Sequence, residues 1–230
     1  MQDQRQHDYF VTGTDTEIGK TLVSSALLFA FTQSGLRTVG MKPVAAGAEL
    51  QNGVWHNEDV DALMAAASVP CPTAWVAPYL MQTPAAPHIV AALENVHISV
   101  AHIQACYQQL VQQADAVIVE GVGGFCVPLN EELTTADLAQ QMGLPVILVV
   151  GMRLGCINHA LLTAEAIAAR GLTLAGWVAN TVDADMLYLN ENLAALRARL
   201  AAPLLGQIPR FEQPTAQAAA GYLNVNFLTL

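Results

Sequence analysis

The chain has 230 residues, of which 53% are hydrophobic and 12% charged, and its net charge is −10. This length suits one α/β domain with a sizeable core and is short for two domains. The acidic balance argues against nucleic-acid binding, which needs clustered Lys and Arg. No apolar run reaches the roughly 18 residues of a membrane span. The polar N-terminus lacks the apolar segment of a secretory signal, so we expect a cytoplasmic protein.

We expect a single domain over residues 1–230, with residues 1–8 as a flexible extension. The high hydrophobic content also suggests a buried subunit interface. The cysteines are widely separated and form no C-x-x-C pair, so the sequence indicates neither a zinc site nor a disulfide framework. Buried free thiols are the simpler interpretation of Cys71, Cys106, Cys126 and Cys156.

Short β-rich runs alternate with alanine-rich helical runs along the chain. In the first half, we predict a strand at 9–12, a helix at 19–33 ended by Gly35, a strand at 37–44 and a helix at 59–67. The stretch VPCPTAWVAPYLMQTPAAPH, from Val69 to His88, contains five prolines and is predicted to be irregular.

The second half repeats this alternation. We predict helices at 99–113, 158–170 and 185–200, and strands at 116–120, 144–150, 174–180 and 204–208. Strands such as AVIVE and PVILVV are continuously apolar, as a parallel sheet covered on both faces requires. The expected fold is therefore a single-domain, doubly wound α/β sheet, mostly parallel, with helices on both faces.

The first predicted strand leads into VTGTDTEIGKTL, which is similar to a phosphate-binding loop. Such loops usually have four residues between the two glycines, whereas five separate Gly13 from Gly19 here. Backbone amides and the helix N-terminus can bind phosphate oxygens, and Thr21 can offer a hydroxyl to magnesium. A glycine loop followed by Lys20 and Thr21 at a strand-to-helix junction indicates a nucleotide phosphate site.

Ligands of doubly wound sheets collect at the carboxyl ends of the strands. There the sequence has Lys42 in KPVAAG and Glu120 in EGVGG, and the segment NEDVD adds Glu58, Asp59 and Asp61. Glu120 can bind magnesium directly or through water. Taken alone, Lys42 could be a solvated surface residue. Asp59 could equally be an acidic residue favoured at a helix N-terminus.

Several motifs together resemble the dethiobiotin synthetase family. They are GTDTEIGKT, KPVA, VEGVGG, VGMRLGCINHALLTAEAI, GWVAN and PLLGQIP, and they run in order through residues 9–228. The resemblance implies a P-loop fold, a homodimer and a role in biotin biosynthesis. It also implies closure of a cyclic urea on 7,8-diaminononanoate with CO2 and MgATP. One amine would form a carbamate, which attacks the γ-phosphate to give a carbamic-phosphoric anhydride, and the second amine would then close the ring.

The resemblance also implies roles for individual residues. Lys20, Lys42, Thr16 and Glu17 would act in catalysis, and Thr21, Asp59 and Glu120 would hold magnesium. The implied nucleotide contacts are Asp15, Thr16, Glu17, Ile18, Gly19, Lys20, Thr21, Glu120, Gly121, Val122, Gly123, Asn180, Thr181, Pro209, Arg210 and Phe211. The implied substrate contacts are Ala46 and, from the neighbouring subunit, the helix end formed by Gly155, Cys156, Ile157 and Asn158.

The acidic residues of the enlarged loop have two interpretations. By resemblance, Thr16 and Glu17 meet the diamine, whose ammonium a carboxylate could hold or deprotonate. Alternatively, Asp15 and Glu17 stabilise the following helix through their negative charge at its N-terminus. The family often has KPVASG where this chain has Ala46, and a tyrosine expected after WVAN is out of register, because Tyr188 lies nearby while Asn192 occupies the matching place.

Two other functions have to be weighed. A cobyrinate diamide synthase type of ligase shares the fold but usually carries a glutamine-amidotransferase domain, for which this chain has no room. A switch ATPase of the ParA or MinD type usually has a lysine early in the phosphate loop, which the segment from Gly13 to Thr16 lacks. Such switches often bind DNA or membranes, which the acidic charge disfavours.

Overall fold

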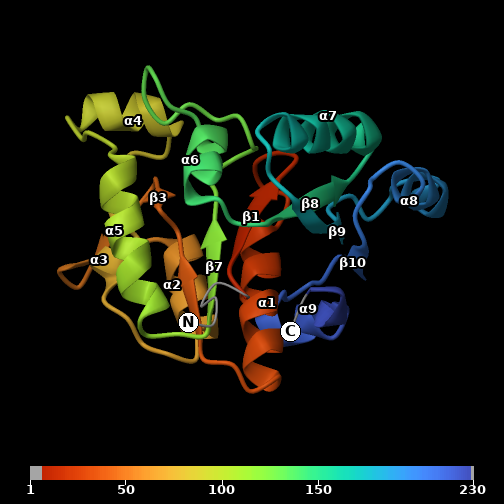
Figure 1. The fold of residues 1–230 in the computed structure, drawn as a ribbon, viewed down its shortest axis with the longest axis horizontal. Helices are drawn as coiled ribbons and strands as arrows, with labels where there is room; N and C mark the ends of the chain where they lie inside the picture. Colours follow the sequence, from red (N-terminus) through yellow and green to blue (C-terminus); the bar gives the residue numbers. More distant parts are fainter. Residues whose placement is uncertain (1–6, 229–230) are drawn as a thin grey trace.

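Six strands form one sheet in which every neighbouring pair is parallel, in the order β10-β9-β8-β1-β7-β2 (Figure 1). The computed structural model describes residues 7–228. The strands are β1 (Tyr9–Gly13), β2 (Thr38–Met41), β7 (Ala116–Glu120), β8 (Val146–Met152), β9 (Leu174–Thr181) and β10 (Leu204–Ile208). Because all six strands run the same way, their carboxyl ends meet at one edge of the sheet.

Helices cover both faces of the sheet, which confirms the predicted doubly wound fold. In β7, Ala116 and Ile118 pack into the cluster that contains α1, while Val117 and Val119 pack into the cluster on the opposite face. The first face is covered by α1 (Lys20–Gln33) and α9 (Ala216–Ala220). The second is covered by α5 (Val100–Val111), α6 (Thr135–Met142), α7 (Cys156–Ala169) and α8 (Leu189–Arg197). Both faces of the central strands β1, β7 and β8 are therefore buried, which explains their continuous apolar runs.

The second predicted strand is shorter than expected because the chain leaves the sheet at Pro43. Strand β2 ends at Met41, and β3 (Val44–Ala45) pairs with β6 (Tyr79–Leu80) in a separate two-stranded sheet. Proline has no amide hydrogen to continue the ladder. The bend carries Lys42 to the carboxyl edge of the main sheet, and its amide donates to the carbonyl of Val76 at 2.8 Å.

The proline-bearing stretch is more regular than predicted. It contains the short helix α3 (Thr73–Val76), strand β6 and the start of α4 (Pro87–Leu93). Pro87 stands in the first turn of α4, where a missing amide hydrogen costs no helical hydrogen bond. Helix α2 (Glu58–Ala66), which precedes this stretch, packs beside α1 and β2 and agrees with its predicted position.

Three predictions about local structure were incomplete. The hairpin of β4 (Glu49–Gln51) and β5 (Val54–His56) turns at Asn52 and Gly53, with φ angles of 52° and 82°. Asn-Gly is a strong hairpin signal that our prediction did not use. Helix α6 was also missed, although Thr134 and Asp137 form a capping box at its start. Helix α8 begins at Leu189 rather than 185 because Tyr188 adopts a left-handed conformation with φ 57°.

We predicted a flexible extension over residues 1–8, and this prediction is wrong for Asp8. Residues 1–6 lie outside the described part of the chain. Asp8, in contrast, is 1% exposed. Its carboxylate accepts hydrogen bonds from the Tyr107 hydroxyl at 2.6 Å and the Val117 amide at 2.7 Å. A buried carboxylate needs such partners, so Asp8 joins α5 to β7 and belongs to the folded domain.

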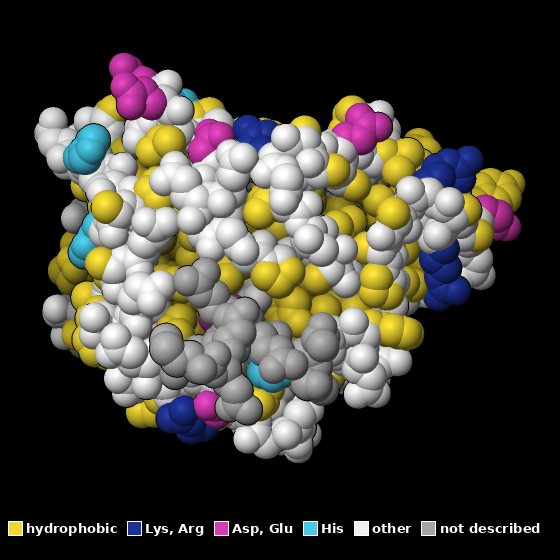
Figure 2. All heavy atoms as spheres, viewed as in Figure 1, with side chains coloured by type: hydrophobic (Ala, Val, Ile, Leu, Met, Phe, Trp, Pro, Cys, Tyr) yellow, Lys and Arg dark blue, Asp and Glu magenta, His cyan; other side chains and the backbone are white. Residues whose placement is uncertain are grey.

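The surface and the cysteines agree with most of the composition-based expectations. On the face seen in Figure 2, Lys and Arg side chains form scattered groups and no continuous basic patch. Within residues 7–228, no helix has both the length and the apolar character needed to cross a bilayer. The four cysteines are free thiols; Cys106 and Cys156 are buried as expected, whereas Cys126 is exposed.

Replacing Tyr107 with Phe removes a hydrogen bond from the buried Asp8 carboxylate. We expect the free energy of unfolding to fall by about 1–3 kcal/mol, because a buried charged acceptor loses a partner. Urea denaturation monitored by circular dichroism measures the change. The matched control is Tyr222→Phe, at a side chain that is 50% exposed, where a change within about 0.5 kcal/mol is expected. Equal effects of the two substitutions would contradict this role for Asp8.

Candidate active site

The loop between β1 and α1 is held in place by β8 and β9. The Thr14 amide donates to the Val149 carbonyl at 3.0 Å, and the Asn180 side-chain amide donates to the Ile18 carbonyl at 2.8 Å. Ile18 is 1% exposed and fills space beside two glycines. A Cβ at Gly13 or Gly151 would lie 2.7 or 2.5 Å from the Ile18 side chain. These contacts fix the loop before any ligand binds.

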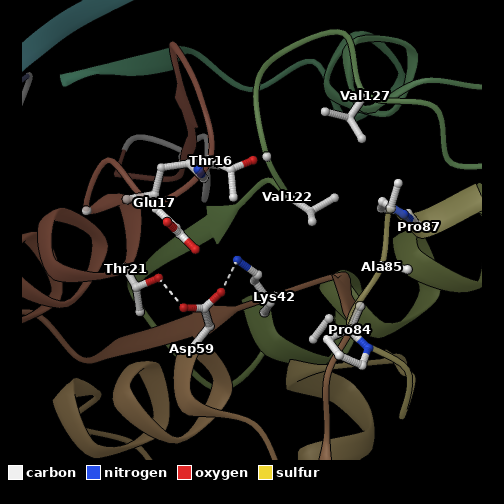
Figure 3. A pocket seen from close by; sticks show the side chains of 16 residues that line it. Thr16, Glu17, Thr21, Lys42, Asp59, Pro84, Ala85, Pro87, Val122 and Val127 are labelled. Carbon is white, nitrogen blue, oxygen red and sulfur yellow. Dashed lines mark hydrogen bonds and ion pairs between the residues drawn. The ribbon is translucent and has the colours of Figure 1, made fainter. Parts of the chain in front are cut away.

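Two loop residues adopt left-handed conformations for different reasons. Gly19 has φ 82°, and a Cβ there would lie 2.3 Å from the Asn180 side-chain nitrogen, so only glycine fits. Glu17 has φ 56° although it carries a side chain. Strained backbone of this kind clusters at functional sites, where the surrounding structure maintains it. The side chain of Glu17 thereby reaches the same cavity as Lys42 (Figure 3).

Lys20 follows the loop and is 6% exposed. Its ammonium donates to the backbone carbonyl of Asp15 at 2.8 Å. Burial and then the positive charge of Lys42 lower the pKa of Lys20 to about 8. The ammonium is therefore inside the loop that would surround a phosphate chain, and its charge is sensitive to mildly alkaline pH.

Lys42 is the second buried cation of the site, at 3% exposure. Its ammonium lies 2.6 Å from a Glu120 oxygen and 2.7 Å from an Asp59 oxygen. Burial opposes the charge of Lys42, but the two carboxylates outweigh it and raise its pKa. The same contacts lower the pKa of Asp59 although burial opposes this. The solvated-surface interpretation of Lys42 is therefore wrong. The sequence contains two lysines, and both lie here.

Thr21, Asp59 and Glu120 meet as the sequence suggested. The Thr21 hydroxyl lies 2.6 Å from Asp59 and 2.9 Å from Glu120, so one hydroxyl proton faces two carboxylates. The other Glu120 oxygen is buried and has no hydrogen-bond partner within the described residues. Mg2+ is commonly held by one or two carboxylates together with water and substrate phosphates. Two carboxylates, one of them with an unpartnered oxygen, and a hydroxyl therefore fit magnesium bound jointly with a nucleotide.

A cavity of about 800 Å³ joins these groups (Figure 3). One part is polar and charged and the other is apolar. The polar part is lined by Thr16, Glu17, Gly19, Lys20, Thr21, Lys42 and Asp59. The apolar part is lined by Ala45, Ala46, Pro84, Ala85, Ala86, Pro87, Val122 and Val127, and Gly123 completes the lining. The cavity can therefore hold a charged group next to an aliphatic one.

The nucleotide contacts predicted at the end of β9 and after β10 lie along the same sheet edge but do not line this cavity. Asn180 and Thr181 end β9, and Pro209, Arg210 and Phe211 follow β10, which pairs with β9. An Arg210 nitrogen donates to the Val182 carbonyl, so these two strand ends are joined. The Asn180 side-chain nitrogen already donates a hydrogen bond to the Ile18 carbonyl. Asn180 therefore positions the loop, a role that our prediction missed.

The predicted substrate contacts at the start of α7 also lie apart from the cavity within one chain. Gly155 precedes the helix with φ 94°, Cys156 is 1% exposed, and Ile157 and Asn158 complete the first turn. Leu154, just before them, is 91% exposed. A single chain therefore does not bring this helix end to its own lysines.

The other two carboxylates of the segment NEDVD do not line the cavity of the lysines. Glu58 and Asp61 line a neighbouring cavity of about 440 Å³, together with Glu49 and His56, and Asp61 pairs with His56 at 3.0 Å. The sequence analysis did not predict that Pro84 to Pro87 form a wall of the cavity. It also did not predict a contact between Arg153 and the loop residue Asp15. A long proline-bearing loop is itself a signal of function.

The sequence profile of a family described as "AAA domain" matches residues 7–218. A protein described as ATP-dependent dethiobiotin synthetase BioD, from Janthinobacterium sp. (strain Marseille), is 57% identical over 223 residues. The match spans 95% of this chain and 94% of that protein. The chain belongs to the dethiobiotin synthetase family. This membership confirms the resemblance seen in the motifs and favours it over the two alternative functions.

Solved structures of other proteins share the fold of this dethiobiotin synthetase family member. A ParA family ATPase from Chlorobium tepidum TLS has a TM-score of 0.56 at 11% identity, covering 95% of this chain and 92% of that chain. A chain of a MinC:MinD cell division protein complex from Aquifex aeolicus has a TM-score of 0.54 at 12% identity, covering 96% of this chain and 88% of that chain. At identities this low, the likeness shows a common fold and carries no information on activity.

Nucleotide affinity should depend on the proton of Lys20. As pH rises through about 8, Lys20 loses its charge. Binding of MgATP to the wild-type protein should therefore weaken, by roughly tenfold at one pH unit above that value. Lys20→Arg should show no such decline, because a guanidinium stays charged in this range. Calorimetric titration from about pH 7 to about pH 9.5 compares the two. Parallel pH profiles would contradict the assignment.

Proposed function

We propose that the chain is a dethiobiotin synthetase that acts in biotin biosynthesis. It would close a cyclic urea on 7,8-diaminononanoate with CO2 and MgATP, releasing ADP and phosphate. The observation that carries the proposal is the single cavity in which a phosphate loop, two buried lysines and two carboxylates face an apolar wall. The 57% identical relative supports the same reaction.

The two lysines address the main electrostatic difficulty of this reaction. A carbamate and a triphosphate are both anions, and their approach requires positive charge between them in a site of low dielectric. Lys20 follows the loop, and both Lys20 and Lys42 line the polar part of the cavity. Together they would stabilise the transferring phosphoryl group while each is held by carboxylate or carbonyl oxygens. The positioning of the two substrates by these fixed charges should therefore dominate the rate of the reaction.

Magnesium would be held by Thr21, Asp59 and Glu120, where it would neutralise charge on the β- and γ-phosphate oxygens. The unpartnered oxygen of Glu120 supports this role. Backbone amides at Ile18, Gly19 and Gly123 would donate to phosphate oxygens, and Gly121 and Val122 would lie beside them in the turn after β7. Adenine would lie beyond the cavity, near Asn180, Thr181, Pro209, Arg210 and Phe211.

The diamine would span the polar and apolar parts of the cavity. Thr16 and Glu17 would contact its amines, and the Glu17 carboxylate could accept an ammonium proton before attack on CO2. The wall of Pro84, Ala85 and Val127 would contact the aliphatic chain, and Ala46 would approach through its backbone. Proton acceptance by Glu17 gives a functional reason for its left-handed backbone.

The carboxylate end of the substrate would bind the start of α7 of a second copy of this chain. The amides at Gly155, Cys156, Ile157 and Asn158 form a helix N-terminus that favours an anion. Leu154, just before α7, and Leu162, within it, are 91% and 56% exposed. A symmetric partner would bury these apolar side chains, and their exposure therefore supports a homodimer with active sites at its interface. The need for ATP and CO2 supports a cytoplasmic location.

The reaction is tested with purified protein, bicarbonate, magnesium, ATP and 7,8-diaminononanoate, omitting one component at a time. We expect dethiobiotin by mass spectrometry and one phosphate released per product. Lys42→Gln should lower turnover roughly a hundredfold or more, with magnesium and nucleotide still bound. Arg37→Gln, a change at an exposed ion pair, is the control and should retain full turnover. Diamine-independent phosphate release without dethiobiotin would reject the proposal.

The shared site is tested by mixing two inactive variants. Lys20→Ala inactivates a cavity, and Ile157→Asp places a repelling carboxylate at the helix end that would serve the partner. Random reassociation of equal amounts should restore about one quarter of wild-type activity, because half the dimers are mixed and each has one intact site. Mixing Lys20→Ala with Lys42→Gln is the control and should restore none. Absence of recovery in the first mixture would place each complete site within one subunit.

A further inference from the structure

The enlarged loop brings a second carboxylate, besides that of Glu17, close to a phosphate site. It belongs to Asp15, whose backbone carbonyl accepts a hydrogen bond from the Lys20 ammonium at 2.8 Å. One of its carboxylate oxygens accepts the Thr16 amide at 2.8 Å. The charge of Asp15 is among those that act on Lys20 and raise its pKa against the effect of burial. A nucleotide bound by this loop would therefore experience the negative charge of Asp15.

Arg153 is paired with this carboxylate. It follows β8, and its guanidinium donates to the second oxygen of Asp15. The side chains are 42% and 44% exposed, and they are 138 residues apart in the sequence. Neither residue lines the cavity of the lysines. The ion pair therefore touches no reacting group and acts on the site through the loop.

Inside the cavity, Lys20 is the cation on which the charge of Asp15 acts, and a bound nucleotide would need that same cation. Lys42 already forms ion pairs with Asp59 and Glu120. Glu17 adds a further carboxylate to the lining of the cavity. A nucleotide brings several negative charges to this site. Without Arg153, the carboxylate of Asp15 would repel those charges over a short distance, and exposed charges interact appreciably at separations below about 10 Å.

We propose that Arg153 is a positioning residue for nucleotide binding, which neutralises Asp15 and so allows an acidic residue in the phosphate loop. The inference extends the proposed function to a further residue but depends only on nucleotide binding. The Asp15 carboxylate remains useful because it fixes the Thr16 amide, while its charge is cancelled from outside the cavity.

The experiment is a set of four proteins titrated with MgATP by calorimetry at about pH 7, where Lys20 is charged. They are wild type, Arg153→Gln, Asp15→Asn and the double variant. Arg153→Gln should weaken MgATP binding roughly three- to tenfold, because it exposes the carboxylate. Asp15→Asn keeps an oxygen for Thr16 but removes the negative charge, and its measured affinity is the reference for the double variant. The double variant should bind MgATP as tightly as Asp15→Asn does. A fifth protein, Arg153→Lys, should resemble wild type.

Two controls separate this role from others. Arg37→Gln removes a comparable exposed ion pair with Asp115 and should leave MgATP affinity unchanged. Raising the salt concentration should narrow the difference between wild type and Arg153→Gln, because exposed charges are screened. A double variant as weak as Arg153→Gln would mean that Arg153 binds the nucleotide directly. That result, or unchanged affinity in Arg153→Gln, would overturn the proposal, whereas failure to form dethiobiotin would not affect it.

Discussion

The Lys42 ammonium lies between the carboxylates of Glu120 and Asp59, and the arrangement of the whole site depends on this contact. Glu120 ends a buried strand and is itself fully buried, so its charge requires a partner. Lys42 can supply that partner because Pro43 ends β2 and turns the chain across the sheet edge. Asp59, at the start of α2, is drawn to the same ammonium and brings Thr21 into contact. A buried ion pair is weak evidence of stability, but loss of one member leaves an uncompensated charge. The parallel sheet thus maintains an electrostatic cluster that is ready for a charged ligand.

The loop beside this cluster combines rigid and adjustable parts. Ile18, Asn180 and Thr14 attach it to β8 and β9, and Gly19 permits the close approach of Asn180. In contrast, the Lys20 ammonium is held by a backbone carbonyl, which phosphate oxygens can replace because they are stronger, charged acceptors. The backbone is therefore preorganised while the cation can transfer to its ligand. This division explains why the side chain of Ile18 is buried although its amide serves the proposed nucleotide site.

The fold and the central charged residues could be predicted from the sequence because they follow from periodicity and topology. Apolar strands alternating with helices imply parallel pairing, and parallel pairing places residues after β1, β2 and β7 together. Lys20, Lys42 and Glu120 were found in this way. Other features depend on the path of long loops, which the periodicity of apolar residues does not determine. They are the wall from Pro84 to Pro87 and the Asp15–Arg153 ion pair. The hairpin at Asn52 and Gly53 and the capping box at Thr134 were signalled locally, so these omissions were avoidable. The helix end at Gly155 would need a second chain in the proposed dimer, and the sequence of one chain does not place a partner.

The distribution of primary amines has a practical consequence. Both lysines of the chain are buried beside one cavity, whereas its seven arginines include the exposed Arg37. Apart from the N-terminus, amine-directed reagents would therefore find targets at the proposed catalytic centre alone. Covalent acylation of lysine would act as an active-site titration, and bound nucleotide would protect against it. The same distribution means that immobilisation or cross-linking through surface lysines is unsuited to this protein, and that carboxylates or Cys126 are better points of attachment.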